Sequence, residues 1–499
     1  MPPQTLAAVA ALVSFAPHGN RIELALDHGS AELVWVTPAT FRFRRALSGP
    51  LPESKTPAHE TVPVEIEDNP GRLVVRSRRL EVTIRKNGVL LAVRRADGQV
   101  LLDDMSEPRP SGPGVVWERR RPPDARLYGL GPHTSHELDL RDRAVTADRP
   151  FLLSSAGYAE FHAAPGSYRF DFTAAGLYRI EAPAVDYYFH AGAAPKQIFE
   201  EHAELDLPDP AWNATPDAPG SWDSLASTLL RVVHGAISGM MAPTLSLRPW
   251  VAAPEELQRR ARQLGSLVDD VSPGPLGLSD LRGQLETFLS TYAQERHDRG
   301  FPIWHPLPFQ FPQDPECARH ADEFLLGDEL LVAPVYEPGG KRQVYLPQGV
   351  WTNLETGRAT PGRQIVAVET AGLPVFARNG TILPLDSPGG VALHYFPTLP
   401  AEFFIFEPDP PQWSQIHAAP AADIVRLQIE SKRARQYQWV VHHVDRPAEV
   451  GFEGTRYPVV PALDKLVPGT WFYDAGRRNL HVLLRVAAGE DRIVNLVFP

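Results

Sequence analysis

The sequence predicts a multidomain α+β protein in which β-structure predominates. A chain of 499 residues has room for about three or four domains of typical size. Its 51 prolines and 37 glycines are typical of many short strands joined by turns. Helical periodicity is concentrated between Trp212 and Gly300, and strand patterns precede and follow that stretch.

Strands are expected first along the N-terminal part of the chain, up to about Leu102. Apolar residues alternate or cluster there with β-branched bias, and Asn87-Gly88 and Asp97-Gly98 supply tight-turn chemistry. This pattern favours a β-sandwich. The expected strands are 22–26, 32–36, 73–77 and 80–84, followed by a second group at 157–161, 168–172 and 185–189.

A helix is expected from Pro195, because proline suits a first helical turn. Two amphipathic helices should follow, one carrying Leu257, Ala261 and Leu264, and one after Ser279, which is interpreted as its N-cap. Strands return after Leu325. They are expected at 330–335, 343–346, 365–368 and 375–378, with a last β module over 391–499.

Composition excludes some classes of partner. Acidic residues outnumber basic ones, 60 to 49, and the sequence has no dense basic cluster, so neutral ligands such as sugars fit better than nucleic acid. The single cysteine, Cys317, cannot form an internal disulfide and is interpreted as inert. The apolar run 6–16 has no positive charge before it, which favours a buried first element and a cytoplasmic protein. No apolar run is long enough to span a bilayer.

Several segments resemble glycoside hydrolase family 31. The region after that family's catalytic barrel is similar to Phe324-Leu-Leu-Gly-Asp-Glu-Leu-Leu-Val-Ala-Pro-Val335, Val344-Tyr-Leu-Pro-Gln-Gly-Val-Trp351 and Leu373-Pro-Val-Phe-Ala-Arg-Asn-Gly-Thr-Ile-Leu-Pro-Leu385. The family's N-terminal β-sandwich is similar to Tyr128-Gly-Leu-Gly131, Gly157-Tyr-Ala-Glu-Phe161, Tyr168-Arg-Phe-Asp-Phe172 and Asp186-Tyr-Tyr-Phe-His-Ala-Gly192.

The resemblance implies retaining exo-α-glycosidases, chiefly α-glucosidases and α-xylosidases. It implies a galactose-mutarotase-like β-sandwich, a (β/α)8 barrel and C-terminal β-sandwich domains. The sequence departs from that plan in the barrel, since only about 90 residues lie between Trp212 and Gly300, whereas eight βα units occupy roughly 250. The family's nucleophilic aspartate, in a Trp-x-Asp-Met-Asn/Glu motif, has no counterpart. A truncated, mainly helical barrel remnant is therefore expected.

The resemblance nominates Asp217, five positions before Trp222, as the acid/base candidate. Two further segments that face the sugar in the family carry small or inert residues here. The segment 246–250 lacks the family's aspartate, and Ser272-Pro-Gly274 replaces its Arg-Asn-His. Retaining cleavage needs two carboxyl groups about 5 Å apart, so one aspartate cannot perform it.

Other candidates have structural interpretations beside the functional ones. Asp217 suits a turn or N-cap as well as a proton donor, and Asp223 suits a helix start. Asp328 is interpreted as a structural strand-turn residue. The aromatic side chains of Trp212 and Trp222 are candidates for stacking on a sugar, or else core residues.

No metal or cofactor is expected, because the histidine pairs His133/His136 and His442/His443 lack acidic or cysteine partners nearby in the sequence. The open edges of a shortened barrel favour association with a second copy or another protein. The expected domains are 1–190, 191–322, 323–390 and 391–499.

The sequence therefore favours a degenerate, catalytically inactive family member with a role in binding carbohydrate, such as an α-glucoside, or in assembly. Two alternatives stay open. One is an active α-glucosidase that uses Asp217 as acid/base with an unidentified nucleophile, and the other is a purely structural protein.

Overall fold

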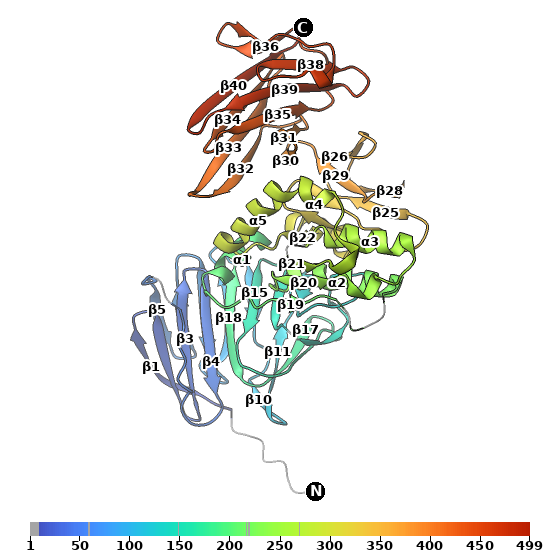
Figure 1. Cartoon of the computed structure of the whole chain (residues 1–499). Coiled ribbons are helices and arrows are strands. Elements are labelled where there is room, and N and C mark those ends of the chain that lie inside the picture. Colours follow the sequence, from blue (N-terminus) through green and yellow to red (C-terminus); the bar gives the residue numbers. More distant parts are fainter. Residues whose placement is uncertain (1–8, 58–59, 148, 216, 218–219, 269) are drawn as a thin grey trace.

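The computed structural model describes residues 9–57, 60–147, 149–215, 217, 220–268 and 270–499. The chain runs from N-terminal sheets at the bottom of Figure 1, through a helical region, to a pair of C-terminal sheets at the top. Strands dominate both ends, and most of the helices lie in the middle, as the sequence predicts.

Three sheets form the N-terminal part. The eight-stranded sheet runs β1 (Leu12–His18), β2 (Arg21–Leu26), β3 (Ser30–Thr37), β4 (Thr40–Ala46), β18 (Val185–Ala191), β15 (Tyr158–His162), β14 (Phe151–Ser154), β12 (Leu127–Gly129). One five-stranded sheet runs β5 (Glu65–Asn69), β6 (Arg72–Arg76), β7 (Leu80–Arg85), β8 (Leu90–Arg95), β9 (Val100–Asp103). The other runs β10 (Arg109–Ser111), β11 (Gly114–Arg120), β17 (Leu177–Ala182), β16 (Tyr168–Asp171), β13 (Ala144–Ala147).

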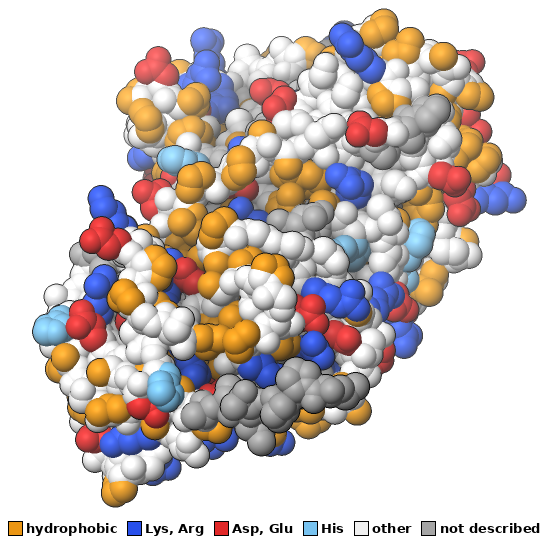
Figure 2. Space-filling model, turned by 90° about the horizontal axis from the view of Figure 1, so that it is seen from below, with side chains coloured by type: hydrophobic (Ala, Val, Ile, Leu, Met, Phe, Trp, Pro, Cys, Tyr) orange, Lys and Arg blue, Asp and Glu red, His pale blue; other side chains and the backbone are white. Residues whose placement is uncertain are grey.

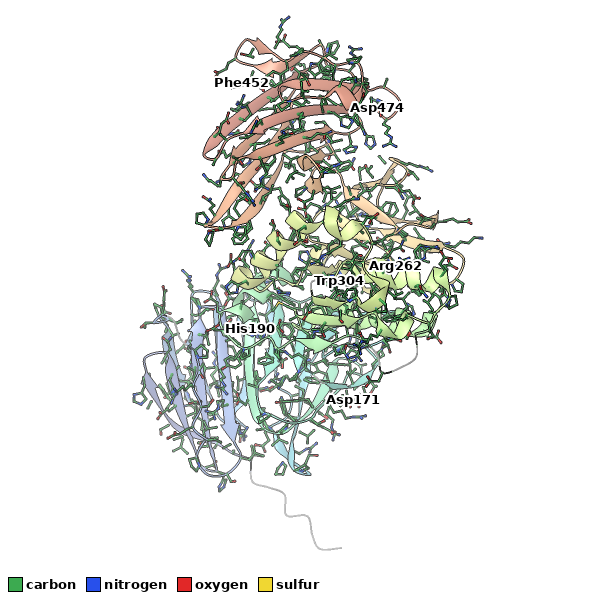
Figure 3. The ribbon with its side chains drawn as sticks, viewed as in Figure 1. Asp171, His190, Arg262, Trp304, Phe452 and Asp474 are labelled. Carbon is green, nitrogen blue, oxygen red and sulfur yellow. The ribbon has the colours of Figure 1, made fainter. Side chains whose placement is uncertain are left out.

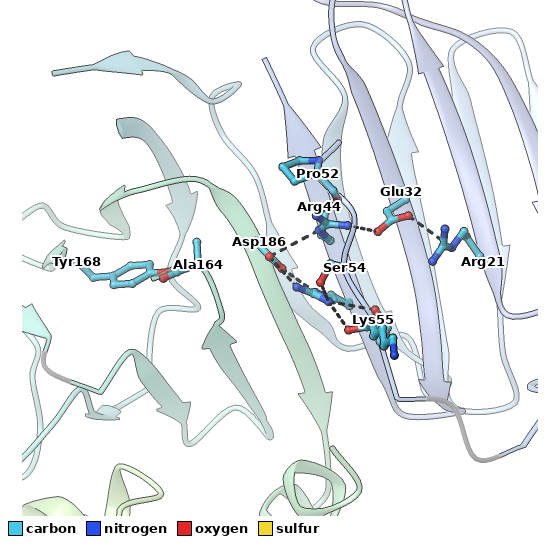
Figure 4. Close-up of polar contacts among 11 residues, drawn as sticks. Arg21, Glu32, Arg44, Pro52, Ser54, Lys55, Ala164, Tyr168 and Asp186 are labelled. Atoms are coloured by element: carbon cyan, nitrogen blue, oxygen red, sulfur yellow. Dashed lines mark hydrogen bonds and ion pairs between the residues drawn. The ribbon is translucent and has the colours of Figure 1, made fainter. Parts of the chain in front are cut away.

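One hydrophobic core joins these three sheets, with members such as Trp35, Val82 and Phe170. Several charged side chains on β3, β4 and β18 form ion pairs (Figure 4). Arg42 donates to both carboxylate oxygens of Asp186 at 2.7 Å, and Arg44 donates to Glu32 at 2.8 Å. The pattern of apolar cores with paired charges confirms the β-sandwich character expected from the sequence.

The middle of the chain holds helices and a small parallel sheet. The helices are α1 (Pro195–Ala203), α2 (Trp222–Ile237), α3 (Glu255–Gly265), α4 (Leu281–Gln284), α5 (Glu286–Arg299) and α6 (Leu307–Gln310). The sheet consists of β19 (Trp212–Asn213), β20 (Pro243–Ser246) and β21 (Asp270–Ser272). Short 3-10 turns lie at η1 (Arg248–Trp250), η2 (Gly274–Leu276), η3 (Pro315–Arg319) and, near the C-terminus, η4 (Leu463–Lys465).

A proximal sheet follows, in the order β22 (Trp304–Pro306), β23 (Phe324–Leu326), β24 (Leu330–Val332), β29 (Val375–Arg378), β26 (Val350–Asn353), β27 (Ala359–Pro361). Beside it β25 (Lys341–Leu346) pairs with β28 (Gln364–Glu369). The two sheets share a core that includes Trp351 and Cys317.

Two sheets form the C-terminal end. One runs β30 (Ile382–Ser387), β31 (Gly390–Tyr395), β35 (Arg435–Val441), β39 (Asn479–Val486), β38 (Thr470–Asp474). The other runs β32 (Ala401–Pro408), β33 (Pro411–Pro420), β34 (Ile424–Ser431), β40 (Glu490–Val497), β36 (Glu449–Phe452), β37 (Thr455–Arg456).

Two local predictions were wrong. The first described element is not buried, because β1 is an edge strand and Val13 is 69% exposed; residues 6–8 of the apolar run lie outside the described residues. Ser279 is not a helix N-cap. Its hydroxyl lies 2.8 Å from that of Ser266, and Asp280 occupies the cap position of α4.

Candidate functional site

The small parallel sheet is the part of the chain where the sequence locates the candidate site. β20 pairs in parallel with β19 and with β21, and helices α2 and α3 form the two crossovers. The carboxyl ends of all three strands therefore lie at one edge. In parallel α/β arrangements this edge is where ligands bind, so the segments that follow the strands are the ones to compare with the predictions.

Local sequence explains how helix α2 begins at this edge. Ser221 accepts a hydrogen bond from the backbone N–H of Ser224, and the Ser224 hydroxyl accepts one from the backbone N–H of Ser221. This capping box fixes the first turn. Asp223 lies in that turn, where a carboxylate is favoured by the helix dipole, and its side chain is exposed.

The structure places Asp217 on the loop between β19 and α2, and its side chain is exposed. Its neighbours 216, 218 and 219 lie outside the described residues. Ser246 ends β20 and Ser272 ends β21, so the three positions nominated by the sequence follow the same edge of the sheet. Of these three positions, only Asp217 carries a carboxylate.

The chain's own backbone packs across this edge. The N–H of Ser246 donates to the Thr215 hydroxyl at 2.9 Å, and the N–H of Gly220 donates to the Pro249 carbonyl at 3.0 Å. A side chain at Gly220 would begin 2.1 Å from that carbonyl oxygen, so the close approach requires glycine. Trp250 is fully buried, and its indole N–H donates to the carbonyl that precedes α2 at 3.3 Å.

Both tryptophan candidates lie in the first βα unit. Trp212 packs closely on α2, since a side chain at Gly235 would begin 2.5 Å from the Trp212 ring. The Arg231 guanidinium lies 6.0 Å from the ring centroid, and the indole N–H donates to the Met240 carbonyl. Trp222 is the half-buried first residue of α2 and packs against the main core. These contacts give each ring a packing role.

A buried hydrogen bond just after α2 connects the helical region to the N-terminal sheets. The hydroxyl of Ser238, just after α2, accepts a hydrogen bond from the N–H of Gly131 at 2.9 Å and donates to the His234 carbonyl at 2.6 Å. Gly131 closes the segment Tyr128-Gly-Leu-Gly131, one of those that carry the resemblance to family 31. The end of α2 is therefore held in place by the β-sandwich.

A second polar cluster, at the turn between β23 and β24, was not predicted beyond Asp328 itself. The Lys196 ammonium of α1 lies 2.7 and 2.6 Å from the two Asp328 oxygens, and His305 Nδ1 lies 3.1 Å from Oδ1. The Tyr292 hydroxyl donates to Glu329 at 2.7 Å. A glycine is needed at 327 in the turn, because a Cβ there would begin 2.3 Å from the Tyr292 ring.

The pKa values of the two acidic side chains of this cluster, Asp328 and Glu329, are shifted in opposite directions. Burial opposes ionisation of Asp328, but His305 and Lys196 outweigh it and hold the pKa of Asp328 well below its usual range. Burial, followed by the Asp328 charge, raises the pKa of Glu329 well above its usual range. The cluster joins α1, α5 and the proximal sheet, which supports the structural interpretation of Asp328.

His133 and His442, from the two histidine pairs noted in the sequence, meet other histidines in the structure. His442 Nε2 lies 3.0 Å from His394 Nδ1, and His133 and His234 meet edge to face with ring centroids 5.5 Å apart. Within the described ranges, no group of three or more His, Cys, Asp or Glu side chains is placed to hold a metal ion. His136 instead lies beside Tyr336, and its Nδ1 is 3.7 Å from Asp322 Oδ2.

The surface carries mixed charge. Charged side chains of both signs are interspersed over the face seen in Figure 2. Across the part of the chain that the structure describes, no helix has both the length and the apolar character needed to cross a membrane.

The β-rich sheets at both ends and the small parallel sheet between them define a multidomain, β-rich α+β fold. The model of the glycosyl hydrolase family 31 C-terminal domain matches residues 300–383. The human neutral alpha-glucosidase AB is 29% identical over 301 residues, covering 56% of this chain and 29% of that protein. An alpha-glucosidase from Saccharolobus solfataricus is 34% identical over 107 residues, or 21% of this chain and 15% of the relative.

Solved structures agree in fold. A family 31 dextranase from Flavobacterium johnsoniae matches with a TM-score of 0.79 and 15% identity, covering 98% of this chain and 100% of that one. The cycloalternan-forming enzyme of Listeria monocytogenes matches with a TM-score of 0.81 and 13% identity, covering 98% and 77%. Residues 300–383 are therefore similar to the C-terminal domain of glycoside hydrolase family 31, and the fold of the chain is similar to that of solved family 31 enzymes. It spans 29% of the human relative and 15% of the archaeal one.

Proposed function

We propose that this chain is a catalytically inactive member of family 31 whose barrel is truncated, and that it binds carbohydrate without cleaving it. The carboxyl edge of the parallel sheet carries this proposal. Asp217 is exposed there, and the positions after the other two strands are Ser246 and Ser272-Pro-Gly274. Hydrolysis with retention of the anomeric configuration needs two carboxyl groups about 5 Å apart, and hydrolysis with inversion needs a pair about 6.5 to 9.5 Å apart.

The length of the helical region supports the truncation. About 90 residues separate Trp212 from Gly300, and they contribute three parallel strands among the described residues. A closed barrel of eight strands needs roughly 250 residues. The missing length corresponds to the part of the family barrel that carries the nucleophile. One deletion therefore accounts for both the absent nucleophilic aspartate and the barrel that does not close.

An assembly role is the companion proposal. In the described residues β19 and β21 each pair on one side only, with β20, so their other sides are sheet edges. Unpaired edges favour pairing with another chain. We therefore retain a second copy or another protein as a proposed partner, together with the domain boundaries 1–190, 191–322, 323–390 and 391–499 and a cytoplasmic location as predictions.

Titration calorimetry of the full chain with maltose, isomaltose and glucose tests the binding role. We expect saturable heat for at least one of the three sugars, and no consumption of that sugar during the titration. An absence of heat for all three would favour the purely structural alternative. Release of glucose that is abolished by Asp217→Asn would instead establish the active α-glucosidase.

A further inference from the structure

A cavity of about 720 Å³ lies where three parts of the molecule meet. Helices α3 and α4, strands β23, β24 and β29 of the proximal sheet, and the β30 to β38 sheet all contribute to its wall. Figure 3 labels Arg262 of α3 and Asp474 at the end of β38 on the same side of the molecule, which locates the junction. Binding sites for small molecules have volumes of about 300 to 1,000 Å³.

One wall of this junction cavity is aliphatic. It includes Leu281 of α4, Leu326 of β23, Leu330 of β24, Val375 of β29 and Leu385 of β30, with Leu463 of η4 at 48% exposure. None of the described residues that line the cavity is Phe, Tyr or Trp. The C–H face of a sugar ring packs best on a flat aromatic ring, whereas an alkyl chain adapts to an irregular aliphatic surface.

The β30 to β38 sheet, which contributes Leu385 to the aliphatic wall, also contributes neutral polar groups to the lining. His394 and His481 lie on either side of Val440 in one row of the sheet, because Val440 is the register partner of both. Gln438 Nε2 lies 3.0 Å from His481 Nδ1. Burial lowers the pKa of His394 to about 4, so its imidazole is neutral at about pH 7 and offers a hydrogen bond without charge.

The charged groups of the lining disfavour an anion. Asp280, Glu355 and Asp474 are acidic, and Arg477 is the single Lys or Arg among the described lining residues. The Asp474 carboxylate already accepts hydrogen bonds from the N–H groups of residues 476 and 477. A carboxylate head group would therefore meet more like charge than opposite charge.

We propose that the junction cavity binds a neutral single-chain amphiphile, with its alkyl chain along the aliphatic wall and a hydroxyl-bearing head against the His394, Gln438 and His481 side chains. This site is separate from the proposed carbohydrate site, since its lining includes none of Asp217, Ser246 and Ser272-Pro-Gly274, and its ligand is recognised mainly through the alkyl chain. The aliphatic wall supplies most of the affinity, and the neutral polar row selects an uncharged head.

Calorimetry of the full chain with n-octyl β-D-glucopyranoside, below its critical micelle concentration, tests the proposal. Methyl β-D-glucopyranoside has the same head without the chain, and octanoate has a chain with a charged head. The expected result is saturable binding of the octyl glucoside with affinity at least about tenfold above that of either control. If methyl glucoside binds as tightly as octyl glucoside, the proposal is overturned in favour of a sugar site. If octanoate binds as tightly, the proposed selection of an uncharged head group is overturned.

Two exposed leucines supply a matched pair of variants. Leu463→Asp places a charge in the aliphatic wall, whereas Leu399→Asp places one on a leucine that is 64% exposed and outside the cavity lining. Leu463→Asp should weaken octyl glucoside binding at least about tenfold, and Leu399→Asp should leave it unchanged. Equal binding of octyl glucoside by both variants would show that it adsorbs elsewhere on the surface, and would contradict binding in the junction cavity. Octyl glucoside that does not bind the parent chain would do the same.

Discussion

Glu329→Gln should stabilise the protein increasingly as pH rises. Glu329 is buried, with 6% exposure, and its Oε2 accepts hydrogen bonds from the Tyr292 hydroxyl at 2.7 Å and from the Asp328 N–H at 3.0 Å. A glutamine oxygen can accept both bonds. The substitution therefore removes the ionisable group and keeps the packing and the acceptor.

The magnitude follows from the raised pKa of Glu329, which burial causes first and the Asp328 charge second. A glutamate in the unfolded chain has a pKa of about 4.3. Between that pH and the raised pKa of Glu329 in the folded state, the folded chain holds one more proton than the unfolded chain. Stability from this group is complete below the unfolded pKa and is lost as pH rises toward the folded pKa. The loss is about 1.4 kcal/mol per pH unit, or about 2 kcal/mol between about pH 5.5 and 7.

Urea unfolding followed by tryptophan fluorescence at about pH 5.5 and 7 measures this effect. The difference in unfolding free energy between Glu329→Gln and the parent should rise by about 2 kcal/mol across that interval. Glu337→Gln, the same substitution at an exposed glutamate, is the matched control. A difference that is constant or that shrinks with pH would refute the reasoning, because Glu329 would then be ionised in the folded state.

Three further substitutions or probes follow from buried groups. Arg119→Ala should cost about 3–5 kcal/mol of unfolding free energy because it leaves Glu160 buried without its cation. Arg120→Ala, at an exposed arginine, should cost at most about 1 kcal/mol. Equal losses in urea titrations would contradict the pairing of Arg119 with Glu160. Trp250→Ala should cost about 3–5 kcal/mol by the same measurement, and a loss below about 1 kcal/mol would mean that this ring does not close the sheet edge. Cys317 should react with a thiol reagent only after unfolding, because it is fully buried and burial raises the pKa of its thiol; rapid labelling of the native chain would contradict that burial.

Local patterns were sufficient to predict individual strands and helices in several parts of the chain. The alternation in 22–26 and 80–84 reappears as β2 and β7, and proline at 195 begins α1. These features depend on side-chain period and on backbone restrictions that a short window contains. The predicted burial of the first strand failed because edge position depends on which strand pairs beyond it, and composition does not carry that information.

The candidate site was predictable in its residue types but not in its packing. The resemblance located Asp217, Ser246 and the segment up to Gly274, and the parallel sheet brings the ends of their strands to one edge. The closure of that edge by Trp250 and Gly220 depends on contacts between separate loops, which the sequence does not reveal. The lysine of α1 and the aspartate of the β23–β24 turn are 132 positions apart, so their pairing too required the folded chain.

Covalent trapping tests most directly whether this chain lacks an attacking carboxylate. A 5-fluoro-α-D-glucosyl fluoride reacts with the nucleophile of a retaining α-glucosidase and leaves a slowly hydrolysed glycosyl enzyme, which intact-mass spectrometry detects. The parent chain should keep its unmodified mass after prolonged incubation with excess reagent. A single glycosyl adduct, mapped to one aspartate or glutamate, would contradict the proposed inactivity.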